Sequence, residues 1–274
     1  MAGLKRRPGE PARTLGVLVK AHPWHGVPIG PEAPEVVTTF IELVPSDTVK
    51  YELDKLTGLL KIDRPQQYSN ICPTPYGFIP QTLCAEDVGA FCSERTGRRG
   101  IVGDGDPMDI CLLTEKDITH GNVLVQAIPI GGLRMLDGQE ADDKILAVLL
   151  NDAMYGSWRD LADCPAPLLD RLRHYFLTYK QSPDRSAAPC EITHLYGREE
   201  AYEAIRRSHA DYRRHFGEFT GLLDSETAPG LVTLGSRPSA ARPRGPRKRR
   251  SSSRGTSRSP GRRAKAPSAR RRGR

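Results

Sequence analysis

Three aspartates stand within six residues in the segment VGDGDPMDICLLTE (102–115): Asp104, Asp106 and Asp109. The apolar run at 110–113 follows them directly and predicts a buried strand. Three carboxylates at the mouth of a buried strand repel one another unless a cation neutralises them. Hard divalent cations prefer oxygen ligands of this kind, so the segment predicts a metal site. A solvated acidic loop that caps a strand is the alternative.

Two other metal-binding patterns are excluded. The spacing of the aspartates matches the opening of a calcium loop, but its bidentate glutamate would be Glu115, and the apolar strand in between prevents the chain from wrapping around one ion. The six cysteines form no CxxC pair and the seven histidines form no HExxH motif, so a zinc site is not expected.

A second acidic cluster lies in LRMLDGQEADDKILAV (133–148). Asp137, Asp142 and Asp143 precede Lys144 and another apolar run. An ordinary acidic turn between two strands would have the same composition. If the strands that follow the two clusters form a β-barrel and both clusters lie at the same end of it, five or six carboxylates converge there beside Lys144.

A third group of charged residues lies on a predicted pair of strands. It comprises Glu42, Lys50, Glu52 and Arg64. Lys50 and Glu52 share one face of a strand because side chains alternate with a period of two. Singly, such residues are typical of a solvated surface. Together with the acidic clusters, they predict a site for metal ions and a multiply charged oxyanion.

The remaining pattern predicts many short strands followed by two helices, an α+β fold with a β-barrel-like core. Segment 69–82 is too rich in proline for a helix or a central strand, and 84–101 is interpreted as a surface insertion. The predicted strands are 36–45, a hairpin within 50–64 around Thr57-Gly58, 110–114, 122–136 and 144–150. The predicted helices are 166–180 and 198–216, the second ending before Gly217.

The charge is divided unevenly along the chain. Residues 236–274 hold 16 Lys and Arg and no acidic residue, whereas residues 1–235 hold 25 basic and 33 acidic residues. The tail contains no large apolar side chain and is predicted to be disordered. It could bind nucleic acid or another polyanion through phosphate contacts, or be a solvated extension without a partner.

These features suggest three parts: a loosely ordered lead-in (1–20), one folded domain that carries the predicted site (21–220) and a disordered basic tail (221–274). The sequence contains no run of about 18 apolar residues, so no membrane span is expected. It also shows no secretory signal, and reduced thiols are the simplest account of the scattered cysteines. Cytoplasmic location is the expectation.

DGDPMDI (104–110) resembles the DGDPhD signature of the family I soluble inorganic pyrophosphatases, where h is apolar. The resemblance covers roughly residues 20–217, with the motifs in the family's order. The other matching motifs are IEL with Glu42, KYELDK (50–55), Gly58, IDR (62–64), PYG (75–77), IPQT (79–82), LDGQEADDK (136–144) and YK (179–180). The resemblance implies a closed OB-like five-stranded β-barrel with flanking helices. It also implies Mg²⁺-dependent hydrolysis of pyrophosphate to two orthophosphates, and a homo-oligomer.

The resemblance assigns roles by position. Asp106 matches the carboxylate that accepts a proton from the attacking water. The implied metal ligands are Asp104, Asp109 and Asp142, with Asp137, Glu52 and Glu42 for additional ions. The implied contacts to phosphoryl oxygens are Lys50, Arg64, Tyr76, Lys144, Tyr179 and Lys180.

The sequence departs from the family at Cys72. Many members carry a tyrosine four residues before the one matching Tyr76, and cysteine does not supply the same phenolic hydrogen bond. A packing thiol or a redox role are the two interpretations of Cys72. The competing functions for the whole chain are a nucleic-acid-binding or polyphosphate-tethered protein with a metal-binding core, and a metal-binding pseudoenzyme.

Overall fold

The computed structural model describes residues 20–181 and 190–227. The predicted lead-in, apart from Lys20, and residues 228–274 of the predicted tail (221–274) lie outside the described residues. The strands are β1 (Val37–Leu43), β2 (Val49–Leu53), β3 (Leu60–Pro65), β4 (Tyr76–Phe78), β5 (Val102–Gly103), β6 (Asp109–Leu113), β7 (Val123–Asp137), β8 (Glu140–Ala141), β9 (Lys144–Leu149) and β10 (Cys190–Gly197). The helices are α2 (Glu86–Thr96), α3 (Ala166–Thr178) and α4 (Arg198–Thr227), with a 3-10 turn, η1 (Leu161–Asp163).

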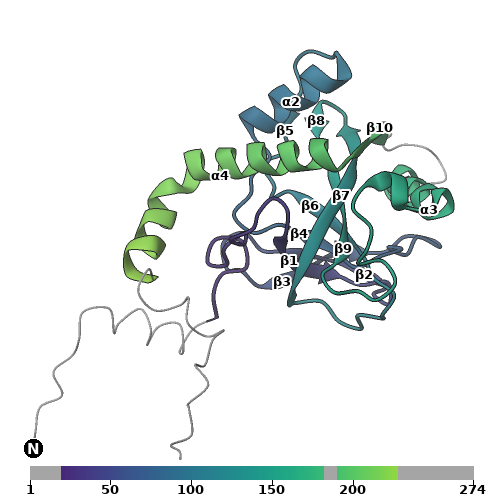
Figure 1. The fold of residues 1–274 in the computed structure, drawn as a ribbon, viewed down its shortest axis with the longest axis horizontal. Coiled ribbons are helices and arrows are strands. Elements are labelled where there is room, and N and C mark those ends of the chain that lie inside the picture. The colour runs from purple at the N-terminus through teal and green to yellow at the C-terminus, as the bar shows by residue number, and fades with distance from the viewer. Residues whose placement is uncertain (1–19, 182–189, 228–274) are drawn as a thin grey trace, which may run out of the picture. The chain divides into compact units, whose positions relative to one another are not determined.

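Five strands close into a ring, which confirms the predicted barrel (Figure 1). The order is β1-β4-β6-β9-β7, and β7 pairs back to β1. The pairing of β6 with β9 is parallel, and the other four pairings in the ring are antiparallel. All seven residues of β1 are buried, as expected for a β-branched and aromatic strand with covered faces.

β7 is long enough for its two parts to pair with two different strands. Its first part, Val123–Ala127, pairs with β1, and its second part, Gly131–Asp137, pairs with β10. The register with β9 shifts between Pro129 and Gly131, where a bulge bends the strand. The hairpin of β2 and β3 confirms the predicted turn around Thr57-Gly58 and forms a separate two-stranded sheet.

The prediction that segment 69–82 is excluded from the central sheet is wrong for Tyr76–Phe78. These three residues form β4 between β1 and β6. Pro75 and Pro80 flank the strand, so no ladder hydrogen bond is lost within it. At Gly77 an added Cβ would lie 1.9 Å from the carbonyl oxygen of Phe40, so this close approach of two strands requires glycine.

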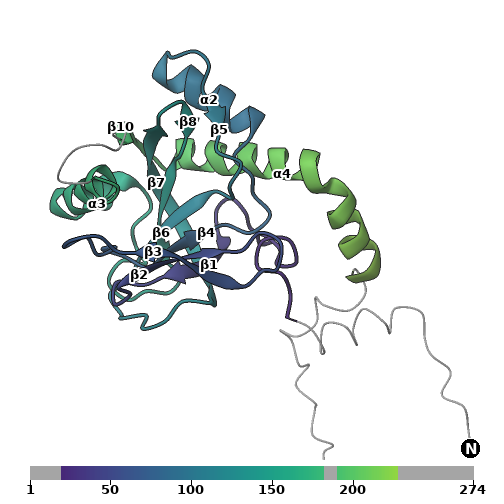
Figure 2. The same cartoon turned by 180° about the vertical axis from the view of Figure 1, so that it is seen from behind.

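The helices cover the outside of the barrel (Figures 1 and 2). α3 confirms the first predicted helix. Segment 84–101, interpreted as a surface insertion, contains α2, which buries Val88, Phe91 and Cys92, and residues 97–100 after it are exposed. α4 packs on β7 and α2 and continues past its predicted end, with a kink at Phe216 where the backbone leaves helical torsion angles. Within the described residues, no helix has the length and apolar character needed to cross a membrane.

A buried ion pair ties α4 to the barrel. The Arg134 side chain on β7 is fully buried and lies 2.7 Å from Asp143 Oδ2 and 2.7 Å from Glu200 Oε1 of α4. Its guanidinium also lies over the rings of Phe91 (4.7 Å) and Tyr196 (4.9 Å). Burial raises the pKa of Asp143 to about 6, and the neighbouring Arg134 opposes that rise. The two charges therefore depend on each other for stabilisation.

Replacing Arg134 by leucine should lower the free energy of unfolding by about 3 to 5 kcal/mol, because Asp143 would stay buried without its counter-charge. The matched control is Arg98→Leu, which breaks the Arg98–Glu191 pair at 46% and 50% side-chain exposure. That loss should stay below about 1 kcal/mol. Urea unfolding measures both, and equal losses would contradict the assignment.

Candidate active site

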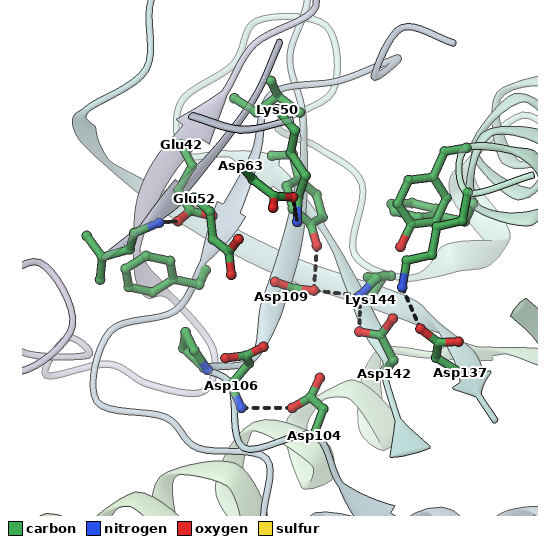
Figure 3. Close-up of a pocket in the computed structure, with 18 of the residues that line it drawn as sticks. Glu42, Lys50, Glu52, Asp63, Asp104, Asp106, Asp109, Asp137, Asp142 and Lys144 are labelled. Atoms are coloured by element: carbon green, nitrogen blue, oxygen red, sulfur yellow. Dashed lines mark hydrogen bonds and ion pairs between the residues drawn. The ribbon is translucent and has the colours of Figure 1, made fainter. Parts of the chain in front are cut away.

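One cavity of about 300 Å³ lies where the barrel meets the β2–β3 hairpin and the end of α3. It is lined by every residue to which the resemblance assigned a role, and Figure 3 labels ten of the lining side chains. These predicted residues are Glu42, Lys50, Glu52, Arg64, Tyr76, Asp104, Asp106, Asp109, Asp137, Asp142, Lys144, Tyr179 and Lys180. Asp104, Asp106 and Asp109 of the first acidic cluster therefore converge with Asp137 and Asp142 of the second.

The first residues of two parallel strands lie at the centre of the cavity. Asp109 begins β6 and Lys144 begins β9, and the register places them opposite each other. Lys144 Nζ donates to Asp109 Oδ2 at 2.5 Å and also to Asp142 Oδ1. The Tyr76 hydroxyl of β4 donates to the same Asp109 oxygen. An ammonium group that is only 2% exposed thus holds two predicted metal ligands in place (Figure 3).

The acidic loop that carries Asp104 and Asp106 is fixed by its backbone. Gly105 has φ +75°, a left-handed conformation that glycine adopts without strain. The Asp106 N–H donates to Asp104 Oδ1 at 2.9 Å. The Cys84 N–H donates to the Asp106 carbonyl at 2.8 Å, and the Gly105 N–H donates to the Cys84 carbonyl at 2.9 Å. An added Cβ at Gly103 would lie 2.2 Å from the Cys84 carbonyl oxygen, which makes this contact specific to glycine.

The β2–β3 hairpin supplies the basic side chains of one wall. Lys50 and Arg64 lie opposite each other in its register, and both pair with Asp63, Lys50 at 3.5 Å. Behind them, the Leu53 N–H donates to Glu42 Oε1 at 2.6 Å and links the hairpin to β1. Lys50 and Glu52, which a period of two places on one face of β2, both line the cavity, and so do the adjacent Asp63 and Arg64 beside the register shift of the hairpin.

The opposite wall comes from the end of α3. Tyr179 caps the helix and its ring stacks on Tyr175 at 5.4 Å between centroids. Burial raises the pKa of Tyr179 to about 12, so the phenol stays protonated at neutral pH. Lys180 Nζ lies 2.5 Å from Asp137 Oδ2 at the end of β7. Both predicted residues of the YK motif therefore face the acidic side of the cavity.

The electrostatics of the cavity favour added cations. Nine carboxyl groups and five basic side chains line it, so negative charge is in excess when all are ionised. Burial raises the pKa of Glu42 to about 8, and repulsion from Asp109 adds to the shift. Burial, followed by repulsion from Asp142, raises the pKa of Asp104 to about 8. Burial also raises the pKa of Asp142. Each raised pKa reflects the free-energy cost of a buried carboxylate that has too little positive charge near it.

These donors suit a hard divalent ion. They are all oxygen atoms, in the number and charge that Mg²⁺ or a similar ion prefers. Within residues 20–181 and 190–227, no three Asp, Glu, His or Cys side chains are grouped closely enough to hold a metal ion as they stand. Lys144 lies between Asp109 and Asp142 and provides their counter-charge.

Comparison with known proteins identifies one family that has both this fold and these motifs. A model of the inorganic pyrophosphatase family matches residues 39–213. An inorganic pyrophosphatase of Chlamydia trachomatis is 52% identical over 196 residues, covering 70% of this chain and 94% of that protein. A soluble inorganic pyrophosphatase of rice is 38% identical over 190 residues, covering 69% and 78%. The crystal structure of an inorganic pyrophosphatase from Thermus thermophilus aligns with a TM-score of 0.59 at 31% identity, covering 70% of this chain and 99% of that one.

The chain belongs to the inorganic pyrophosphatase family. The family predicted from DGDPMDI and its companion motifs is confirmed, and the enzyme class, an inorganic diphosphatase, follows from the membership. The pattern of charges in this pyrophosphatase agrees with a multiply charged oxyanion as substrate.

The cavity of this pyrophosphatase also contains residues that sequence reasoning missed. Asp63 pairs with both hairpin cations, and Lys55 forms an ion pair with Asp106. Glu140 and Tyr175 line the same space. Lys55 lies inside the quoted KYELDK motif, but neither periodicity nor spacing distinguishes it from an ordinary surface lysine. Asp63 lies inside the quoted IDR motif, next to Arg64, but the motif was used only for Arg64.

Two other residues of this pyrophosphatase lie in the protein core and do not line the cavity. Asp143 does not line the cavity and pairs with Arg134, so the second acidic cluster divides between the site and the core. Cys72 is buried, donates to the Thr74 carbonyl at 3.2 Å and is not among the lining residues. Burial raises the pKa of its thiol to about 12. These properties favour a packing thiol over a redox role, since reactivity requires an accessible thiolate.

The raised pKa of Glu42 predicts a pH dependence of stability in the metal-free protein. Folding takes up a proton at Glu42 between about pH 4.5 and pH 8, so this contribution to stability is lost as pH rises through that range. Glu42→Gln keeps an acceptor for the Leu53 N–H and removes the charge. The variant should be more stable than the parent at pH 8 by about 2 to 4 kcal/mol, with the difference vanishing near pH 4.5.

Urea unfolding in EDTA across this pH range measures the difference. The control is Glu191→Gln, an exposed residue whose pKa is lowered by its hydrogen bond with Arg98, so its replacement should bring no gain at pH 8. Parallel stability curves for the parent and Glu42→Gln would refute the assignment.

Proposed function

We propose that this pyrophosphatase hydrolyses inorganic pyrophosphate to two orthophosphates in the cavity described above, with Mg²⁺ as its cofactor. The observation that carries the proposal is the composition of the cavity: an excess of carboxylates beside five basic side chains. Carboxylates alone would suit cations, and basic groups alone would suit a phosphate. Both are needed to bind a highly charged anion together with its metal ions.

The carboxylates divide into two groups in this proposal. Asp104, Asp109 and Asp142 hold the principal metal ions, and Asp137, Glu52 and Glu42 hold ions that arrive with substrate. When bound, Mg²⁺ supplies a water of lowered pKa and screens the phosphate charge. Supporting this division, Asp109 and Asp142 both bind Lys144, whereas Asp137 at the end of β7 and Glu52 on β2 line the cavity from other strands.

The basic side chains bind the phosphoryl oxygens. Lys50 and Arg64 reach the cavity from the hairpin, Lys180 from the end of α3 and Lys144 from the barrel. Tyr76 and Tyr179 add phenolic donors. Each of the four cations has a carboxylate partner inside the cavity, which keeps its stem directed inward before substrate arrives. Preorganised charges of this kind carry most of the catalysis of phosphoryl transfer.

Asp106 accepts the proton of the attacking water. Its side chain is 41% exposed, and its neighbour Asp104 is a proposed metal ligand. A carboxylate that lines the cavity and still contacts solvent is suited to receive a proton and to release it.

Phosphate release from pyrophosphate tests the activity, its metal dependence and the base together. The parent should release phosphate with Mg²⁺ and lose this activity in EDTA. Asp106→Asn should lower kcat by at least about 10², with a modest loss of metal affinity, because the base is removed while the ligands stay. No release with any divalent metal would overturn the proposed activity. Near-normal turnover of Asp106→Asn would remove that residue from the base role.

Cytoplasmic location and homo-oligomeric assembly complete the proposal. The six free, buried cysteines support a reducing compartment, where thiols remain unpaired. The basic tail supports a second candidate function, non-specific contact with nucleic acid or another polyanion, because its 16 basic residues have no acidic neighbours within 236–274. Such a tail would tether the enzyme without taking part in hydrolysis.

Deleting residues 236–274 separates the two functions. Pyrophosphate hydrolysis should remain within about twofold of the full chain, and retention on immobilised DNA at low salt should be lost. The retention of the full chain should fall steeply with salt as counterions compete. If the shortened protein binds DNA as well as the full chain does, the polyanion contact does not belong to the tail.

A further inference from the structure

We propose that Lys55 is a positioning residue of the reaction, which holds the carboxylate of Asp106 in place for proton transfer. The inference depends on the proposed role of Asp106. Lys55 lines the cavity and forms an ion pair with Asp106 Oδ1. The same ammonium donates to the Gly105 carbonyl at 3.2 Å. One side chain therefore binds two consecutive residues of the acidic loop.

The backbone beneath Lys55 is anchored on both sides. Before it, Leu53 is buried and bonded to Glu42. Asp54 Oδ1 accepts hydrogen bonds from the N–H (2.9 Å) and the hydroxyl (2.7 Å) of Thr57, and the Gly58 N–H donates to the Asp54 carbonyl at 2.9 Å. The turn between β2 and β3 is thus held by its own side chains. The turn therefore holds the backbone of Lys55 in a fixed position beside the acidic loop.

The side chain of Asp106 depends on this contact more than its backbone does. The main chain of Asp106 is held from both directions, through its N–H to Asp104 and through its carbonyl from Cys84. Among the described residues, Asp106 Oδ1 has no hydrogen-bond partner, although the atom is buried, and Lys55 Nζ is its ion-pair partner. Lys55 therefore sets the rotamer of the carboxylate.

The other cations of the cavity do not duplicate this contact. Lys50 and Arg64 pair with Asp63, Lys144 pairs with Asp109 and Asp142, and Lys180 pairs with Asp137. Because the Lys55 side chain is 49% exposed, its loss should leave the fold intact. The ion pair is also weak enough to open and re-form during turnover, as is usual for partly exposed pairs.

A double-mutant cycle tests the inference on the full chain with saturating Mg²⁺ and pyrophosphate. Lys55→Gln should lower kcat about threefold to fivefold, the range that a partly exposed ion pair supplies, with KM changed less than twofold. Lys55→Arg should restore most of kcat because the charge returns. In an Asp106→Asn background, Lys55→Gln should have no further effect on kcat, since the two side chains act as a unit.

The control is Lys116→Gln, an exposed lysine outside this cavity, which should leave kcat and KM unchanged. The melting temperature of Lys55→Gln should match the parent, which separates positioning from a structural role. An equal loss of kcat in both backgrounds, or a rise in KM alone, would overturn the inference while leaving Asp106 as the base. Near-normal turnover of Asp106→Asn by itself would overturn the base role and the inference together.

Discussion

The contact of Lys144 with Asp109 and Asp142 is the interaction on which the rest of the site depends. It requires β6 and β9 to be parallel neighbours that start at the same level, because only this register places Asp109 opposite Lys144. The ring closes around the pair through β4 and β7. A lysine buried to this degree would be costly alone, and its two carboxylate partners offset that cost. The barrel and the centre of the site are therefore stabilised by the same three charges.

The excess of acid in the cavity connects stability with function. Raised pKa values at Glu42 and Asp104 show that the folded chain holds carboxyl groups in an environment that disfavours their ionised form. Such an arrangement lowers stability in the absence of added cations. It also strengthens the attraction for the ions that a phosphate substrate requires. A more stable cavity, with fewer carboxylates, would bind those ions less well.

The sequence indicated which residues meet in one cavity because each acidic cluster is followed by an apolar run. DGDPMD and ADDK precede strands that both join the barrel, so their residues arrive at one mouth. Short elements were harder to predict. β4 has three residues, too few for a periodic pattern, and its flanking prolines concealed it. The contact of Lys55 with Asp106 depends on how far a turn reaches across space, which local spacing does not encode. For α4, Gly217 marks the kink next to it rather than the helix end.

Asp142 and Asp143 are adjacent and chemically identical, yet one faces the cavity and the other faces the core. Lys144 binds the first and Arg134 binds the second, on opposite sides of the entry to β9. A slip of one residue in β9 would exchange the two aspartates and would also exchange the apolar side chains that pack into the two core clusters on either side of the strand. The two ion pairs therefore specify the register of β9 during folding. The chain forms both ion pairs only in the strand alignment that also creates the cavity.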